Sequence, residues 1–173
     1  NGMHGSGRDL GIDPALYVAR VVHFDLTVAH ASSWQWWLAV SPYNFKDGLV
    51  YIDYNKEDGQ VYESKLLWGL GNFSFFVRPG AVRLGVNRSD NAGPQDTAAQ
   101  LMASAYRDDE RETLTAVIIN CDKSPRKAKL EVQNLAERGI SEFTAYLTSS
   151  KSNLRKKGSV GAGEMFMVPA RSI

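Results

Sequence analysis

The densest group of side chains suited to ligand binding is Trp34-Gln35-Trp36-Trp37, which places three indoles within four positions. A buried indole needs a partner for its N–H, so a core rarely takes several in a row. The run lies in residues 33–40, an apolar segment of strand length. Because side chains alternate along a strand, we expect Trp34 and Trp36 on one face and Trp37 on the other. The paired indoles predict a surface for stacking a sugar ring; the alternative is a sheet buried on both faces without a ligand.

Few other side chains are spaced for chemistry. Ser41 and Tyr43 begin the loop after the tryptophan segment and are predicted to be polar contacts of the same site. His23 and His30 lie seven residues apart without a third ligand at metal spacing, and we interpret them as packed or solvated histidines. Cys121 is the single cysteine, which excludes an internal disulfide and a cysteine-based metal site. The sequence therefore predicts no metal and no cofactor.

Four carboxylates follow the tryptophan segment: Asp47, Asp53, Glu57 and Asp58. Asp47-Gly48 and Asp58-Gly59 are ordinary turn pairs, so turn formation is favoured over catalysis for these residues. His4, in the glycine-rich opening segment, is a candidate contact that no motif supports. No catalytic residue is assigned within the chain.

Composition excludes several classes of partner. A chain of 173 residues can form one ordinary domain that buries about 70% of its unfolded surface. Its 20 Lys+Arg and 19 Asp+Glu give a net charge of +1, which argues against nucleic acid or an anionic membrane surface as partner. No apolar run reaches the ~18 residues of a membrane span, and no signal peptide opens the chain. The basic cluster at residues 151–157 is predicted to be a solvated loop.

The first 80 residues predict a helix, a strand and a second helix. Asp13 is the expected N-cap of a helix over residues 13–29, with Pro14 at its first position. After the tryptophan strand comes a loop over 41–60, with a short strand at 49–54. A second helix is predicted over 63–76, before Arg78-Pro79-Gly80 stops it. Helix, strand and helix in this order are typical of parallel α/β structure.

Beyond residue 80 the pattern changes to short strands separated by turns, which favours a β-sandwich. Residues 108–111 are the predicted tip of a hairpin, and residues 85–97 a loop. The predicted strands are residues 81–86, 100–106, 113–120, 127–133, 142–148 and 164–168.

An ordered set of motifs resembles glycoside hydrolase family 30 of clan A. The motifs are ASSWQWWLAVSP at residues 31–42, DGLV at 47–50, LGNFSFFVRPG at 70–80 and the closing VPARS at 168–172. That family includes glucosylceramidases, endo-β-1,6-glucanases, endo-β-1,6-galactanases and glucuronoxylan-degrading xylanases. The start of the chain and the tryptophan run are most similar to the β-1,6-galactanase or β-1,6-glucanase branch.

The resemblance implies an α+β fragment: the last β/α units of a (β/α)8 TIM barrel joined to an antiparallel β-sandwich side domain. Residues 1–80 would be the C-terminal segment of the barrel, containing its helix 7, strand 8 and helix 8. Residues 81–173 would be the sandwich. Full-length members of the family are mostly secreted, periplasmic or lysosomal; no location is predicted for this chain.

The resemblance also implies a retaining mechanism, with one glutamate as acid/base and another as nucleophile. Mapped onto the family, both glutamates fall upstream of residue 1, so whether this chain is itself an enzyme stays open. Trp36 matches the tryptophan that lines the subsite next to the scissile bond, with its N–H free for a hydroxyl or carboxylate. Trp34 would share its face and pack deeper in the barrel, and Trp37 would point outward against the helices.

Two functions are consistent with these residues. The first is the C-terminal part of a retaining β-glycosidase acting on β-linked oligo- or polysaccharides such as β-1,6-galactan or β-1,6-glucan, inactive by itself. The second is a non-catalytic carbohydrate-binding or structural β-sandwich module. A severed barrel would expose apolar surface, which predicts self-association.

Overall fold

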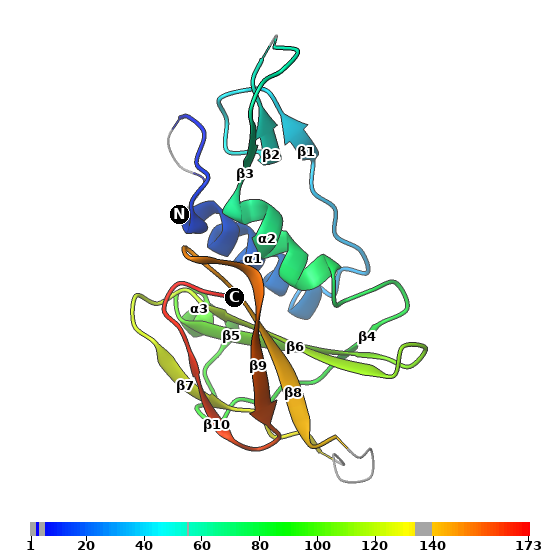
Figure 1. Ribbon diagram of the computed structural model, residues 1–173. Helices are drawn as coiled ribbons and strands as arrows, with labels where there is room; N and C mark the ends of the chain where they lie inside the picture. The colour runs from blue at the N-terminus through cyan, green and yellow to red at the C-terminus, as the bar shows by residue number, and fades with distance from the viewer. Residues whose placement is uncertain (1–2, 4–5, 55, 134–139) are drawn as a thin grey trace.

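The structure, a computed structural model, describes residues 3, 6–54, 56–133 and 140–173. A small sheet lies at one end, a pair of helices lies in the middle, and antiparallel strands pack on the other side of the helices (Figure 1). The elements in chain order are α1 (Ile12–Thr27), β1 (Leu38–Ser41), β2 (Gly48–Ile52), β3 (Val61–Glu63), α2 (Lys65–Ser74), β4 (Val82–Leu84), α3 (Pro94–Thr97), β5 (Leu101–Asp108), β6 (Thr113–Asn120), β7 (Arg126–Lys129), β8 (Glu142–Ser149), β9 (Ser152–Gly161) and β10 (Met165–Val168). No helix among these is long and apolar enough to cross a membrane.

Helix α1 is the centre of the core. It buries a stripe that packs with Leu66 and Phe73 of α2 on one side and with Met102 and Ile119 of the antiparallel strands on the other. The two helices approach closely at Gly69, where an added Cβ would lie 3.0 Å from the Cβ of Ala15. One continuous core therefore joins the helices to the strands beneath them.

The predicted N-cap of α1 was wrong by two residues. Gly11, in extended conformation, is the N-cap, and Asp13 lies in the first turn. The carboxylate of Asp13 forms an ion pair with Arg171 near the end of the chain. The helix ends at Thr27, two residues before the predicted end. Asp13 thus joins α1 to the C-terminal segment, and it does not cap the helix.

The small sheet has the order β1-β2-β3. β1 pairs with β2 in parallel, and β2 pairs with β3 in antiparallel orientation. The predicted strand at 49–54 is confirmed as β2. The predicted helix over 63–76 is shorter, because Val61–Glu63 is a strand and Ser64 is the N-cap, its Oγ accepting from the Leu67 N–H.

The tryptophan strand predicted over 33–40 was also wrong in extent. Strand pairing begins at Leu38, and Trp34 to Trp37 precede it in irregular conformation. In place of a sheet partner, this segment is held by its side chains. The indole N–H groups of Trp34 and Trp36 donate to Asp25 and Asp47.

The antiparallel strands follow the predicted order with one exception. β5 and β6 form the predicted hairpin, and β4 pairs with the other edge of β5. β7 pairs with β10, and β8 pairs with β9. β9 includes all but the first of the basic residues 151–157 that were predicted to form a solvated loop. That prediction failed because residues 155–158 are exposed, and a solvent-facing strand carries Lys and Arg at little cost.

The end of the chain closes the gap between β6 and β8. Ser172 forms bridges to both Asn120 of β6 and Ser149 of β8. The backbone N–H of Asn120 donates to the Ser172 carbonyl at 2.8 Å, and the Thr148 N–H donates to the Ile173 carbonyl at 2.8 Å. The last two residues thus act as a short strand that joins two sheets.

The side chain of Asn120 organises this junction. It is fully buried, and its Nδ2 donates to the carbonyls of Ser124 at 3.0 Å and Pro169 at 2.9 Å. Its Oδ1 accepts from the Asp122 N–H at 3.0 Å. One amide therefore holds the turn after β6 and the segment after β10 together.

We expect Asn120→Ala to lower the free energy of unfolding by about 2 to 3 kcal/mol, because it leaves several buried carbonyls without donors. Urea unfolding followed by far-UV circular dichroism measures the change. Asn87→Ala, at an exposed loop position, is the matched control and should change stability by less than about 0.5 kcal/mol. Equal effects of the two variants would contradict the role given to Asn120.

Candidate functional site

Trp34 and Trp36 stack on each other. Their ring centroids are 5.9 Å apart, and the ring planes differ by 17°. Both side chains are half-buried against the core. The prediction that the two indoles share a face is therefore confirmed, although the segment is not a paired strand.

The N–H groups of both indoles already donate hydrogen bonds within the protein. Trp34 Nε1 donates to Asp25 Oδ2 at 2.8 Å, which ties it to the last turns of α1. Trp36 Nε1 donates to the Asp47 carbonyl at 2.6 Å. The expectation that the Trp36 N–H is free for a sugar hydroxyl or a carboxylate was wrong in this structure, because the turn before β2 supplies a backbone acceptor. What Trp36 offers a ligand is the face of its ring.

Trp37 lies apart from this pair. Its side chain is 79% exposed, whereas an outward position packed against the helices was expected. A single exposed indole does not by itself mark a binding site.

Ser41 and Tyr43 differ in accessibility. Ser41 is fully buried, and its Oγ accepts from the Tyr43 N–H at 3.3 Å. Tyr43 is 52% exposed. The structure thus places Ser41 under the loop, where it supports the backbone of Tyr43, and places Tyr43 at the surface.

Two aromatic residues near Tyr43 were missed from the sequence. The Tyr54 ring lies 5.9 Å from the Tyr43 ring, and the Phe45 ring lies 6.5 Å from it. Both are more than half exposed. Tyr43, Phe45 and Tyr54 form what we call the aromatic cluster. Its only sequence signal was aromatic residues in a loop otherwise rich in Asp, Asn and Gly.

Arg8 and Tyr51 hold the loop that carries the cluster. The Arg8 guanidinium lies 4.5 Å from the centre of the Tyr51 ring, and the Arg8 N–H donates to Asn44 Oδ1 at 2.8 Å. The Tyr51 hydroxyl donates to the Phe45 carbonyl at 2.8 Å and accepts from the Gly48 N–H at 3.0 Å. Burial raises the pKa of Tyr51, so this hydroxyl stays protonated and keeps its donor role.

The four carboxylates that follow the tryptophan segment occupy different environments. Asp53 accepts from the Gln60 N–H at 2.9 Å and lies 3.9 Å from Lys56 Nζ, as expected in a turn. Glu57 and Asp58 are exposed in the same turn. Asp47 lies beside the indole pair, and its buried Oδ1 has no hydrogen-bond partner among the described residues.

The histidines do not form a metal site. His23 is buried on α1, and burial lowers its pKa from 6.5 to about 4. His30 Nδ1 lies 3.1 Å from an Arg83 nitrogen. His4 falls outside the described residues. Across the part of the chain that the structure describes, no group of three His, Cys, Asp or Glu side chains is placed to hold a metal ion.

These observations define a mixed α/β protein that carries an aromatic surface beside a small sheet. The family model described as O-Glycosyl hydrolase family 30 matches residues 1–51, which include the indole pair and β1. The glucuronoxylanase XynC of Bacillus subtilis (strain 168) is 28% identical over 141 residues, which are 82% of this chain and 28% of that protein.

Two solved structures are similar to the whole fold. The conserved exported protein from Bacteroides fragilis matches with a TM-score of 0.81 and 33% identity over 93% of this chain. A family 30 endoxylanase from Clostridium papyrosolvens C71 matches with a TM-score of 0.64 and 19% identity over 95% of this chain. At that identity the endoxylanase shows a shared fold.

Together, the family model and the curated relative support a fragment of a glycoside hydrolase family 30 protein. The chain spans about a third or less of the curated relatives and of the first solved structure, 28% and 32% of their lengths respectively. Consistent with that share, the described strands do not form a closed barrel.

We expect Trp36→Ala to lower the free energy of unfolding by about 2 kcal/mol, because its half-buried ring packs on Trp34 and the core. Trp37→Ala, one residue away and exposed, is the control and should change stability by less than about 0.5 kcal/mol. Urea unfolding of both variants measures the difference. A larger loss for Trp37→Ala would contradict the packing described above.

The buried His23 predicts a stability loss in acid. Its pKa is lowered on folding from 6.5 to about 4, so its neutral form stabilises the fold fully above pH 6.5. As the pH falls toward 4, the unfolded chain takes up a proton that the folded chain does not, and up to about 3 kcal/mol is lost.

His23→Phe keeps a buried ring and should remove this part of the pH dependence. Urea unfolding at pH 7, 5.5 and 4.5 measures the slope. His30→Gln is the control and should retain the slope that His23 causes. An unchanged slope in His23→Phe would show that another group is responsible.

Proposed function

We propose that this chain forms part of a retaining β-glycosidase acting on β-linked glycans, and that it contributes an aromatic wall to the sugar-binding subsite. In this proposal residues 1–80 are the last units of a (β/α)8 barrel and residues 81–173 are its β-sandwich side domain. The match of residues 1–51 to the family model supports the proposal, and so does the order of elements, with a parallel strand pair and two helices before a series of antiparallel strands.

The observation that carries the proposal is the stacked pair Trp34 and Trp36, which lies within the residues matched by the family model. Hydrogen bonds to Asp25 and Asp47 fix both rings. A ring that is already immobile loses little conformational entropy when a sugar stacks on it. Trp36 would therefore present a preorganised apolar face, and Tyr43 an exposed hydroxyl on the loop after β1.

The substrate we propose is a β-linked polysaccharide. The motifs of the chain resemble the β-1,6-galactanase and β-1,6-glucanase branch, whereas the relatives are named a glucuronoxylanase and an endoxylanase. Stacking on an indole recognises the face of a pyranose and not its linkage. A panel of β-1,6-galactan, β-1,6-glucan and glucuronoxylan oligosaccharides covers these possibilities.

We further propose that this chain supplies binding and not the catalytic pair. Retention requires two carboxyl groups about 5 to 5.5 Å apart. Asp53 is engaged in a turn, Glu57 and Asp58 are exposed in it, and Asp47 is occluded beside Trp36. The second candidate function, a non-catalytic carbohydrate-binding module, rests on the same aromatic surface.

We expect the 173-residue chain to release no reducing sugar from any of the three glycans. Binding of the matched oligosaccharide, followed by tryptophan fluorescence, should be weakened at least about 5-fold by Tyr43→Ala. Tyr43 is half exposed, so this variant tests binding without disturbing the core as Trp36→Ala does. Phe75→Ala, also at an exposed aromatic but at the C-cap of α2, is the matched control. Hydrolysis by the chain alone would refute the absence of the catalytic pair, and equal binding by Tyr43→Ala would refute the aromatic wall.

The small sheet predicts self-association of the isolated chain. Val40, Ile52 and Val61 of its three strands are 48%, 37% and 66% exposed. In a complete barrel, neighbouring elements would cover such side chains, and without them the apolar surface favours contact with a second copy. Light scattering after size-exclusion chromatography should show a mass that rises with concentration, and Val61→Lys should reduce it. A monomer at all concentrations would contradict this proposal.

A further inference from the structure

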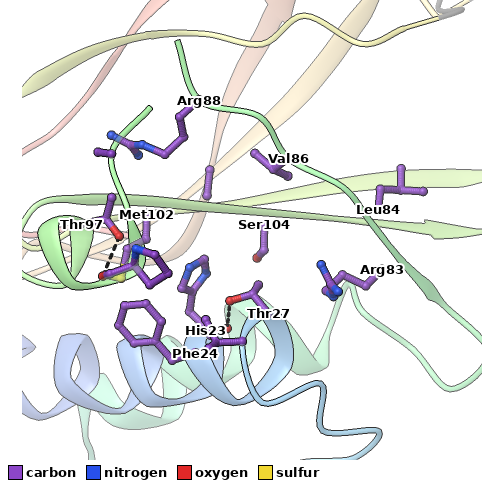
Figure 2. A pocket seen from close by; sticks show the side chains of 14 residues that line it. His23, Phe24, Thr27, Arg83, Leu84, Val86, Arg88, Thr97, Met102 and Ser104 are labelled. Carbon is purple, nitrogen blue, oxygen red and sulfur yellow. Dashed lines mark hydrogen bonds between the residues drawn. The ribbon is translucent and has the colours of Figure 1, made fainter. Parts of the chain in front are cut away.

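A second region of the molecule has the character of a ligand site, and none of the aromatic residues described above lines it. A cavity of about 250 Å³ lies between the C-terminal half of α1 and the strands β4 and β5 (Figure 2). The segment that leads from β4 through α3 forms its remaining wall. The cavity therefore sits where the helix layer meets the antiparallel strands.

Among the described residues, two buried polar atoms at this cavity form no hydrogen bond of normal geometry. They are Nδ1 of His23 and Oγ of Ser104, whose side chains are 6% and 1% exposed. The Tyr106 hydroxyl, which is also buried without a partner of normal geometry, interacts with the Ser104 side chain. In Figure 2 both side chains extend into the space between α1 and β5, and Ser104 points toward the helix. A buried polar group without a partner is costly, and most such groups in proteins are satisfied. These two atoms indicate that the cavity holds an occupant with hydrogen-bonding groups.

The charges at the cavity are positive. Arg83 and Arg88 line it, and no carboxylate does. Arg88 is neutralised by Asp90, with nitrogen and oxygen 2.5 Å apart. Arg83 contacts His30, and within the described residues it has no carboxylate partner. One guanidinium is thus available at the cavity for an anion.

The remaining walls are mostly apolar, and the hydroxyls of the two threonines in them, Thr27 and Thr97, donate to the carbonyls of His23 and Pro94. Phe24, Leu84, Val86 and Met102 surround the polar atoms. His23 has a pKa lowered to about 4 by burial, so at neutral pH its ring is uncharged and donates a single N–H. The lining therefore combines a guanidinium without a carboxylate partner among the described residues, Arg83, and two neutral groups without hydrogen-bond partners with a mostly apolar wall, which suits an organic anion better than an inorganic one.

We propose that this cavity binds a small organic carboxylate. The carboxylate pairs with Arg83 and accepts hydrogen bonds from Ser104 and His23, and the apolar body of the ligand lies against Phe24 and Met102. A volume of about 250 Å³ has room for an aromatic acid, since a water molecule in the liquid takes about 30 Å³. The site is separate from the proposed sugar-binding surface and does not depend on it.

Benzoate and benzamide test the proposal, because they have the same shape and differ in charge. The two are titrated into the 173-residue chain at pH 7 while the Met102 methyl resonance is followed by NMR. We expect benzoate to saturate with a Kd of about 1 mM or tighter. Benzamide and inorganic phosphate should bind at least about 10-fold more weakly, because benzamide lacks the negative charge and phosphate lacks the apolar ring.

Two variants locate the interaction. Arg83→Met should weaken benzoate at least about 10-fold and leave benzamide unchanged. Arg155→Met, at an arginine on β9 that does not line the cavity, is the matched control and should bind benzoate as the wild type does. Ser104→Ala should weaken benzoate as well, while its stability without ligand stays equal or rises, because the unbonded hydroxyl is removed.

Several outcomes would overturn the proposal. The cavity is a water-filled space if no ligand shifts the Met102 resonance. It is not an anion site if benzamide binds as tightly as benzoate, or if Arg83→Met retains full affinity. A clear loss of stability in Ser104→Ala without ligand would show that the hydroxyl has a structural partner, and would remove the main reason for an occupant.

Discussion

The buried hydrogen bonds around Thr148 are the interaction on which the arrangement of the molecule depends. The Thr148 Oγ1 accepts from Asn72 Nδ2 of α2 at 2.7 Å and from the Leu154 N–H of β9 at 3.1 Å. Its backbone pairs with Ile173 at the end of the chain. Three separate segments therefore meet at one fully buried residue. At a buried position each donor needs an acceptor. These hydrogen bonds, together with apolar contact, therefore determine where the helices lie over the strands.

This junction also positions the aromatic surface, through α2. The helix is anchored at Asn72 near its end and by Ser64 at its start, where the hydroxyl donates to the Leu49 carbonyl of β2 at 2.8 Å. From β2, Gly48 and Tyr51 hold the loop that carries Phe45. An added Cβ at Gly48 would lie 2.8 Å from the Ser41 side chain, so the loop packs tightly on β1. The surface loops thus depend on bonds made at the far end of α2.

Much of this could be predicted from the sequence, and the failures have physical causes. The strand 113–120 and the pairing of Trp34 with Trp36 follow from local alternation, which an extended segment keeps even without a sheet partner. β9 was missed because its exposed Lys and Arg have the composition of a loop, and only its pairing with β8 makes it a strand. Tyr54 joins Tyr43 through tertiary contact across the loop. Asp13 has a capping residue's identity, yet its partner, Arg171, lies at the other end of the chain.

The bonded state of the indoles limits what the aromatic surface can recognise. Because the indole N–H groups of Trp34 and Trp36 donate to Asp25 and Asp47, these residues can offer a sugar the faces of their rings but no hydrogen-bond donor. A ring face contributes affinity through dispersion and apolar burial, which differ little between glucose, galactose and xylose units. Discrimination among these sugars requires protein groups that hydrogen-bond a particular sugar hydroxyl, because a sugar without that hydroxyl leaves the buried protein group unsatisfied. Tyr43, on the loop after β1, carries an exposed hydroxyl of that kind, so discrimination among these sugars depends on the loops and less on the tryptophan pair.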